Sequence, residues 1–137
     1  MSLLTPMLRS SPLTDWFSDA QRVQGMLDFE AALAQAQAAC GMVPPEAVGP
    51  IVAACRHEAI DFAALGEAAV GAGNLAIPLV KQLTAQVKAQ DPEAARYVHW
   101  GATSQDAIDT GLVLQLRGAL DAAETLLEQL LAALALQ

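Results

Sequence analysis

The chain has 137 residues, enough for one domain with a buried core, and 54% of them are apolar although only 4% are aromatic. Alanine and leucine dominate the apolar residues, which favours helix over strand because both lose little conformational freedom in a helix. The formal charge is −8, from 15 acidic and 7 basic side chains, and this sign argues against nucleic acid or an anionic membrane surface as a partner.

The first helix is predicted between two capping signals. An arm over residues 1–12, rich in proline and serine, precedes Ser18, and Gln21 follows three residues later as in a capping box. Apolar residues then recur at helical spacing as far as Cys40, and Gly41 is typical of the residue that ends a helix. The face expected in the core consists of Val23, Leu27, Ala31 and Ala34, with Met26, Phe29 and Leu33 beside them.

Three shorter helices are predicted next. Glycines in the segment 71–74 predict a sharp break before the last of them. Asp91 is expected to begin one more short turn, and residues 97–100 are predicted to be extended until Gly101. The expected helices run from about Pro45 to Arg56, from a cap at Asp61 to about Val70, and from about Ile77 to Gln90.

The last predicted element is one helix from about Ser104 to the end of the chain, about 50 Å long at roughly 1.5 Å per residue. Such an apolar helix needs neighbours on several sides, so we expect self-association. It reaches Gln137 without a cap, glycine or proline, and we therefore expect a fragment of a longer helix. The residues at heptad spacing are Val113, Leu116, Leu120, Ala123, Leu127, Leu130 and Leu134.

The segment 99–110 holds the densest cluster of polar residues. Thr103 or Ser104 is expected to cap the long helix, with Asp106 completing a capping box. The unpaired backbone N–H groups of the first turn, the helix dipole and the two hydroxyls together form a receptor for a carboxylate. His99 is placed to donate to the same anion or to orient it. The alternative interpretation is a plain helix start preceded by a structural histidine.

The run His99-Trp100-Gly101-Ala102-Thr103-Ser104-Gln105-Asp106-Ala107-Ile108-Asp109-Thr110 resembles the first signature region of the fumarase/aspartase superfamily. It is most similar to the branch that contains adenylosuccinate lyase and 3-carboxy-cis,cis-muconate cycloisomerase. The tryptophan after the histidine and the glutamine before the aspartate look like the cycloisomerases, as do the segments 17–19, 26–33 and 73–80.

This resemblance implies an all-α fold, in which residues 1–103 form the N-terminal helical domain and residues 104–137 begin the first long helix of the central bundle. It implies a homotetramer with active sites shared between subunits, and no metal or organic cofactor. A cytoplasmic location is expected separately, because the sequence shows neither a signal peptide nor a membrane-spanning run. The family's other two signature regions, including the mobile serine usually assigned to proton transfer, are not found in this sequence. The chain alone is therefore expected to be inactive.

The resemblance also implies roles for individual residues. Thr103 and Ser104 match the residues that hold a substrate carboxylate, and His99 matches a histidine that lines the site. His99 and Ser104 are the candidate catalytic residues, while Asp106 and Asp109 are expected to fix the loop and the helix start. The substrate-binding residues implied are Asn74, His99, Gly101, Thr103, Ser104 and Gln105.

The reaction implied is the addition of one carboxylate of 3-carboxy-cis,cis-muconate to its own double bond, which forms a lactone. Charge that builds on another carboxylate suits donors placed at a helix N-terminus. A polycarboxylate also needs local cations, and Lys81, Arg96 and Arg9 lie nearest in sequence unless they are solvated surface charges. The alternatives are an adenylosuccinate lyase-like C–N lyase, for which the N-terminal arm offers no Arg-Tyr pair, and a non-catalytic helical oligomerisation module.

The remaining residues predict neither a metal site nor a membrane segment. Cys40 and Cys55 lie in alanine-rich helical patterns and are predicted to be small buried groups rather than a disulfide or a metal pair. The two histidines are far apart, and no Cys-x-x-Cys motif occurs. Pro6, Arg9 and Pro12 interrupt any signal peptide, and no apolar run is long enough to span a bilayer.

Overall fold

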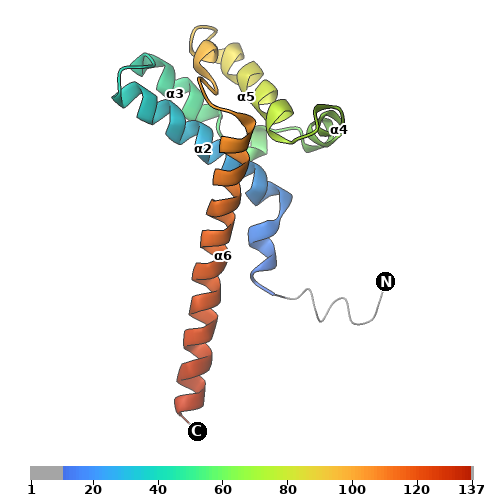
Figure 1. The fold of residues 1–137 in the computed structure, drawn as a ribbon, viewed down its shortest axis with the longest axis vertical. Coiled ribbons are helices and arrows are strands. Elements are labelled where there is room, and N and C mark those ends of the chain that lie inside the picture. Colours follow the sequence, from blue (N-terminus) through green and yellow to red (C-terminus); the bar gives the residue numbers. More distant parts are fainter. Residues whose placement is uncertain (1–10, 137) are drawn as a thin grey trace.

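The structure is a computed structural model that describes residues 11–136, and over this range it contains helices and no β-strand (Figure 1). The predicted all-α class is confirmed. The predicted arm over residues 1–12 lies almost entirely outside the described residues. The α-helices are α2 (Asp19–Ala39), α3 (Pro45–Ala54), α4 (Phe62–Ala72), α5 (Ala76–Gln90) and α6 (Ser104–Ala135), and the short 3-10 helices are η1 (Thr14–Phe17), η2 (His57–Ala59) and η3 (Ala94–Tyr97).

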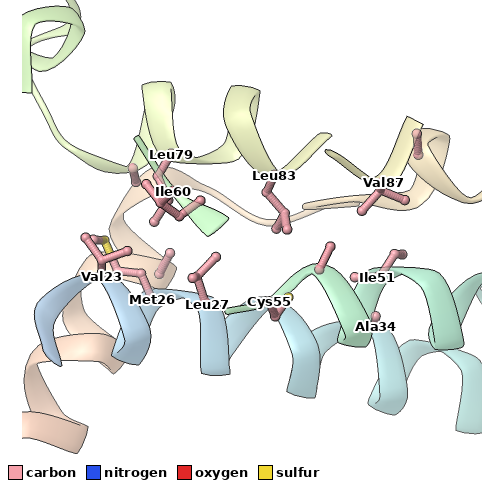
Figure 2. Close-up of a cluster of buried hydrophobic side chains, with 14 of the residues drawn as sticks. Val23, Met26, Leu27, Ala34, Ile51, Cys55, Ile60, Leu79, Leu83 and Val87 are labelled. Carbon is pink, nitrogen blue, oxygen red and sulfur yellow. The ribbon is translucent and has the colours of Figure 1, made fainter. Parts of the chain in front are cut away.

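A head of short helices surrounds one apolar core, and α6 projects away from it (Figure 1). Helices α2 and α3 lie on one side of this core and α5 lies opposite them (Figure 2). Helix α4 packs beside α5 and buries only Leu65. The core side chains drawn in Figure 2 include Val23, Met26, Leu27, Ala34, Ile51, Cys55, Ile60, Leu79, Leu83 and Val87.

The helix boundaries follow the capping residues. The Ser18 hydroxyl accepts the N–H of Gln21 at 3.3 Å, and the Asp61 carboxylate accepts the N–H of Ala64 at 3.0 Å. Each bond satisfies a first-turn N–H that has no intrahelical acceptor. Gly41 and Gly73 follow α2 and α4 with φ of 71° and 75°, a backbone region that favours glycine. The predicted caps at Ser18 and Asp61 and the predicted end of the first helix before Gly41 are thus confirmed.

Three details differ from the sequence prediction. Helix α3 ends at Ala54, two residues before the expected Arg56. Helix α4 continues through Gly71 to Ala72, so the break is confined to the segment around Gly73. Cys40, expected to be buried, is exposed because it is the C-cap residue of α2 and lies beyond the buried helical face, whereas Cys55 is buried as predicted.

Two glycines let α6 cross α2 at very short distance. A Cβ atom on Gly25 would lie 2.9 Å from the carbonyl oxygen of Gly111, and one on Gly111 would lie 3.0 Å from the backbone nitrogen of Met26. Further along α6, the side chain of Trp16 covers Gly118, and Gln115 donates to the Trp16 carbonyl at 2.7 Å. This close packing fixes the first half of α6 to the head.

The second half of α6 has no other described element beside it (Figure 1). Ala119 is its last buried residue, and the leucines beyond it are exposed, including Leu120 at 67%. The continuous helix predicted from the heptad is confirmed. No helix of the described residues is long and apolar enough to cross a membrane. Along the whole of α6, the exposed heptad residues are Val113, Leu116, Leu120, Leu127, Leu130 and Leu134.

Candidate functional site

The start of α6 is built around Thr103, its N-cap residue. The Asp106 carboxylate accepts the backbone N–H of Thr103 at 2.8 Å and its hydroxyl at 3.2 Å, and the Asp106 N–H donates to the Thr103 carbonyl at 3.1 Å. The return contact predicted for Asp106 is therefore present. One consequence was not foreseen: the Thr103 hydroxyl donates its hydrogen to Asp106 and keeps only acceptor capacity.

Ser104 is the first residue of α6, and its hydroxyl makes no hydrogen bond with another described residue. The backbone N–H groups of Ser104 and Gln105 have no intrahelical acceptor, and the positive end of the helix dipole adds to them. The Gln105 side chain points elsewhere, since its amide donates to the carboxylate of Asp109. The capacity of this end of α6 to bind an anion therefore resides in Ser104 and the first-turn backbone.

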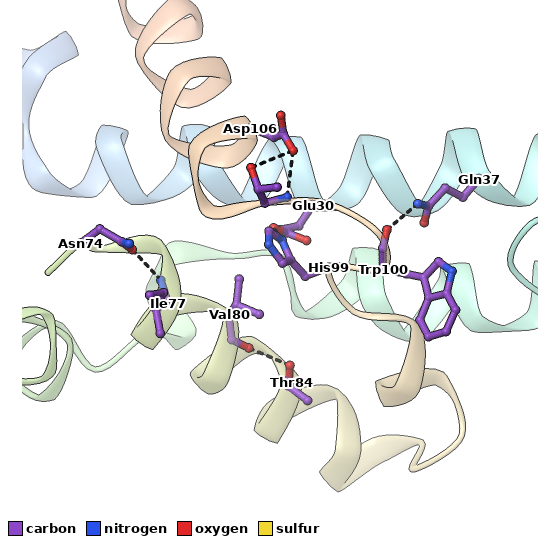
Figure 3. A network of polar contacts seen from close by, with 10 residues as sticks. Glu30, Gln37, Asn74, Ile77, Val80, Thr84, His99, Trp100 and Asp106 are labelled. Atoms are coloured by element: carbon purple, nitrogen blue, oxygen red, sulfur yellow. Dashed lines mark hydrogen bonds and ion pairs between the residues drawn. The ribbon is translucent and has the colours of Figure 1, made fainter. Parts of the chain in front are cut away.

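The loop before α6 is a turn, and the prediction of an extended segment over residues 97–100 is wrong. Tyr97 ends η3, and His99 takes the left-handed conformation with φ of 56°, followed by Gly101 with φ of 69°. A non-glycine residue with positive φ is uncommon and needs support from its surroundings. Two side chains of α2 supply that support, as Figure 3 shows.

The first supporting side chain is Glu30, whose Oε1 lies 2.6 Å from Nδ1 of His99 (Figure 3). Glu30 is 2% exposed, and its second oxygen, Oε2, has no hydrogen-bond partner among the described residues. Glu30 was not among the residues predicted for the site. A signal was available: Leu27, Glu30 and Ala34 are spaced three and four residues apart, so a charged residue occupies the face predicted to be buried.

Burial also sets the protonation chemistry around Glu30. Desolvation raises the pKa of Glu30 above its ordinary value of 4.5, and the hydrogen bond and charge of His99 oppose this rise only in part. The pKa of the nearby Cys55 thiol rises to about 12, first through burial and then through the negative charges of Glu30 and Asp28. Cys55 therefore stays a neutral thiol and acts as a small apolar group in the core.

The second supporting side chain is Gln37, two turns after Glu30 on the same face of α2. Its amide donates to the Trp100 carbonyl at 2.6 Å. The indole of Trp100 is half exposed and its ring packs near Tyr97, with centroids 5.9 Å apart. Glu30 and Gln37 thus hold consecutive residues of the loop, which explains why the chain turns where an extended segment was expected.

Asn74 lies at the start of α5, where its side-chain oxygen accepts the N–H of Ile77 at 3.0 Å (Figure 3). It lines a cleft of about 380 Å³ between α2, α5 and α6. The residues that α6 contributes to this cleft are Ile108, Leu112 and Gln115, which follow Ser104 by one to three turns. Ser104 is not among the residues that line this cleft, and no hydrogen bond joins it to Asn74.

Of the cations considered from the sequence, the two that the structure describes fit the alternative of solvated surface charges. Arg96 forms an exposed ion pair with Glu93 at 3.2 Å, Lys81 is exposed on α5, and Arg9 lies outside the described residues. Arg22, which the sequence analysis did not consider, lines the cleft of Asn74 and forms no ion pair with a described residue. Over residues 11–136 no three metal-ligating side chains come together.

Comparison with known proteins agrees with this architecture. The sequence model of the family described as "Lyase" matches residues 8–137. The 3-carboxy-cis,cis-muconate cycloisomerase of Bradyrhizobium diazoefficiens is 61% identical over 120 residues, which cover 88% of this chain and 27% of that enzyme. The enzyme of the same name from Pseudomonas aeruginosa is 61% identical over 126 residues, which cover 92% of this chain and 28% of that enzyme.

A solved structure shares the same fold. The 3-carboxy-cis,cis-muconate lactonizing enzyme from Pseudomonas putida superposes with a TM-score of 0.86 at 56% identity, over 90% of this chain and 28% of that one. The chain thus spans about a quarter of the length of the relatives it matches. With the family match over nearly the whole sequence, the chain belongs to the lyase family of the fumarase/aspartase superfamily.

Proposed function

We propose that this chain forms part of a 3-carboxy-cis,cis-muconate cycloisomerase, in which it supplies the site for a substrate carboxylate. The observation that carries the proposal is the 61% identity to cycloisomerases over 88% of the chain. The geometry supports the same conclusion, because the Ser104 hydroxyl and the N–H groups of Ser104 and Gln105 make no hydrogen bond with another described residue.

The proposed reaction forms a bond between one carboxylate oxygen and a carbon of the muconate double bond. The neighbouring carbon, next to a second carboxylate, gains a proton, and the product is a carboxymuconolactone. Negative charge accumulates on that second carboxylate before the proton arrives. Ser104 and the N–H groups of Ser104 and Gln105 are suited to that charge, since preplaced donors each contribute about 3 kcal/mol in such sites.

Thr103 and Asp106 have a supporting part in this proposal. Their mutual hydrogen bonds fix the turn that presents Ser104, and the Thr103 oxygen remains available only as an acceptor. The net charge of −8 opposes the approach of a polycarboxylate. The helix dipole and Arg22, which lines the neighbouring cleft, act in the opposite direction at short range.

The exposed leucines of α6 support the homotetramer expected for the whole enzyme. A helix that leaves Leu120, Leu127 and Leu134 exposed has the surface of a bundle helix whose partners come from other chains. The same observation favours the second candidate, a helical module whose only role is association. The two candidates differ in whether the polar start of α6 affects turnover of a muconate.

A chimera tests the proposal. Residues 11–136 replace the matching segment of the Pseudomonas putida lactonizing enzyme, and lactonisation of 3-carboxy-cis,cis-muconate is followed by absorbance. We expect an active enzyme whose kcat/KM falls about 10²-fold when Ser104 is changed to Ala, as for loss of one preplaced donor. Thr103→Ala is expected to lose activity and to lower the melting temperature, because it also removes a hydrogen bond of the helix start.

Thr84→Ala is the matched control for these variants. Its hydroxyl bonds only to the Val80 carbonyl of its own helix, so its activity should equal that of the unmodified chimera. An inactive chimera that nevertheless folds as a tetramer would favour the association module. Equal kcat/KM for Ser104→Ala and Thr84→Ala would remove Ser104 from the substrate site.

A further inference from the structure

Glu30 is an ionisable residue in the interior of the head, where burial of a carboxylate destabilises the fold. It is 2% exposed, and one carboxylate oxygen contacts His99 while the other has no donor among the described residues. A buried carboxylate that lacks its full set of hydrogen bonds destabilises a fold, and an apolar residue of similar volume is often better tolerated. Gln37 also ties α2 to this loop, through the Trp100 carbonyl, so Glu30 is not the sole support of the turn.

The histidine that Glu30 contacts is itself under constraint. His99 has a φ of 56°, which a residue other than glycine adopts only when several contacts enforce it. Its Nδ1 is the nitrogen that meets Glu30, at 2.6 Å (Figure 3). His99 thus combines an uncommon backbone conformation with a contact to the buried carboxyl group of Glu30, and it lies two residues before Gly101 and five before the start of α6.

The other ring nitrogen of His99 is open. Nε2 makes no hydrogen bond with a described residue, and it is not among the buried polar atoms that lack a partner, which are Glu30 Oε2 and Gln37 Oε1. It therefore keeps contact with solvent, consistent with a side chain that is 17% exposed. The two nitrogens of the ring are distinct: one is enclosed by Glu30, and the other is accessible.

We propose that Glu30 is a positioning residue whose carboxylate keeps a hydrogen on Nδ1 of His99 and so presents Nε2 to the substrate. A neutral imidazole that donates through Nδ1 has an unshared electron pair on Nε2, and the protonated ring has an N–H there that can donate to a carboxylate. In both forms the Glu30–Nδ1 contact is the same. The contact of Nε2 with a substrate rests on the proposed function. The position of the hydrogen on Nδ1 does not.

The state of the ring is measurable on the chain itself by NMR, with labelled histidine. The sequence has two histidines, so a variant of His57 assigns both sets of signals. We expect neutral His99 to carry its hydrogen on Nδ1. Glu30→Gln keeps an acceptor oxygen and should keep this tautomer, whereas Glu30→Met removes the acceptor at similar volume and should shift His99 to the Nε2–H form.

Gln37→Met is the matched control, because it removes the other side chain of α2 that holds the loop. It should lower the melting temperature and leave the His99 tautomer unchanged. The inference is overturned if His99 of the unmodified chain carries its hydrogen on Nε2, or if Glu30→Met leaves the tautomer as it was. Melting curves establish that each variant is folded before its spectrum is interpreted.

The kinetic consequence is tested in the chimera described above. Glu30→Met should lower kcat about 10²-fold, the lower end of what a positioned acid–base group contributes, with a smaller change in KM. Glu30→Gln should retain more activity than Glu30→Met. If the unmodified chimera does not turn over the muconate but the tautomer result holds, the proposed function fails and the role of Glu30 stands; equal kcat for all three proteins overturns the positioning role.

Discussion

Glu30 and Cys55 show how position within a helix changes the chemistry of a side chain. Both belong to alanine-rich helical segments, and both lie in the core of the head rather than on its surface. Burial favours the uncharged form of an acid, which explains the direction of both pKa shifts. Residue type and neighbours in sequence do not reveal this, because the same glutamate on the opposite face of α2 would be solvated.

The raised pKa of Glu30 predicts a pH-dependent stability. The unfolded chain releases this proton near 4.5, while the folded chain keeps it to higher pH, so the folded state binds more protons between the two values. The contribution of Glu30 to stability therefore falls as the pH rises from 4.5 through the folded pKa. Relative to the unmodified chain, Glu30→Gln should gain unfolding free energy over that interval, measured by urea denaturation at fixed protein concentration.

The control for this measurement is Glu46→Gln, since Glu46 is an exposed residue in the first turn of α3. Its difference from the unmodified chain should vary much less with pH. A Glu30→Gln difference that is identical at pH 4.5 and at neutral pH would show that burial does not shift this carboxyl group.

The two cysteines should differ in reactivity. Cys40 is exposed at the end of α2, whereas Cys55 is buried and its pKa is about 12, so it provides almost no thiolate in mildly alkaline solution. Iodoacetamide should modify Cys40 alone in the folded chain and both residues in urea, as measured by mass spectrometry of peptides. Modification of the folded Cys40→Ser variant would contradict the burial of Cys55.

At the scale of elements, two glycines without side chains allow α6 to pack closely against α2. Gly25 and Gly111 face one another where α2 and α6 cross, and each leaves too little room for a methyl group. In the sequence, both glycines are residues that weaken a helix. Only the packed structure shows that they allow the backbones of α2 and α6 to approach closely.

Gly111→Ala should destabilise the chain by about 1–3 kcal/mol, because its methyl group would press on backbone atoms of α2 that have no freedom to move aside. The measurement is the urea midpoint at fixed protein concentration. Gly66→Ala is the control: it lies within α4 with open space around it and should gain about 0.5–1 kcal/mol. Equal midpoints for the two variants would contradict the close crossing.

At the scale of the whole molecule, the outer half of α6 exposes a row of leucines. Leu120, Leu127 and Leu134 repeat along one side of a helix that no other described element covers. Exposed patches of this kind mark interfaces. The head, by contrast, buries its apolar residues within one core. The head therefore covers its own apolar surface, whereas the outer half of α6 requires a partner to cover its leucines.

The chain should therefore form oligomers in sedimentation at high concentration, and Leu120→Gln combined with Leu127→Gln should shift it toward monomer. Val70→Gln is the control, because Val70 is 86% exposed but belongs to α4 and not to the row of exposed leucines on α6. A strictly monomeric profile of the unmodified chain would contradict the prediction.

The helices and most of their ends were predictable from the sequence alone. Caps such as Ser18 and Asp61, terminators such as Gly41, and the heptad of α6 act over three to seven residues, so the information lies within one segment. The resemblance in the segment 99–110 likewise identified the family. What remained open depended on residues far apart in the chain.

Only the tertiary structure decided how the loop before α6 turns and what supports it. Glu30 and Gln37 reach that loop from 69 and 63 residues away in sequence. Glu30 holds His99, whose positive φ local preference disfavours, and Gln37 holds the Trp100 carbonyl. The physical reason is that helix caps and periodicity are local interactions, while burial, the partner of a charge and the accessible nitrogen of a histidine depend on which distant segments the core brings together.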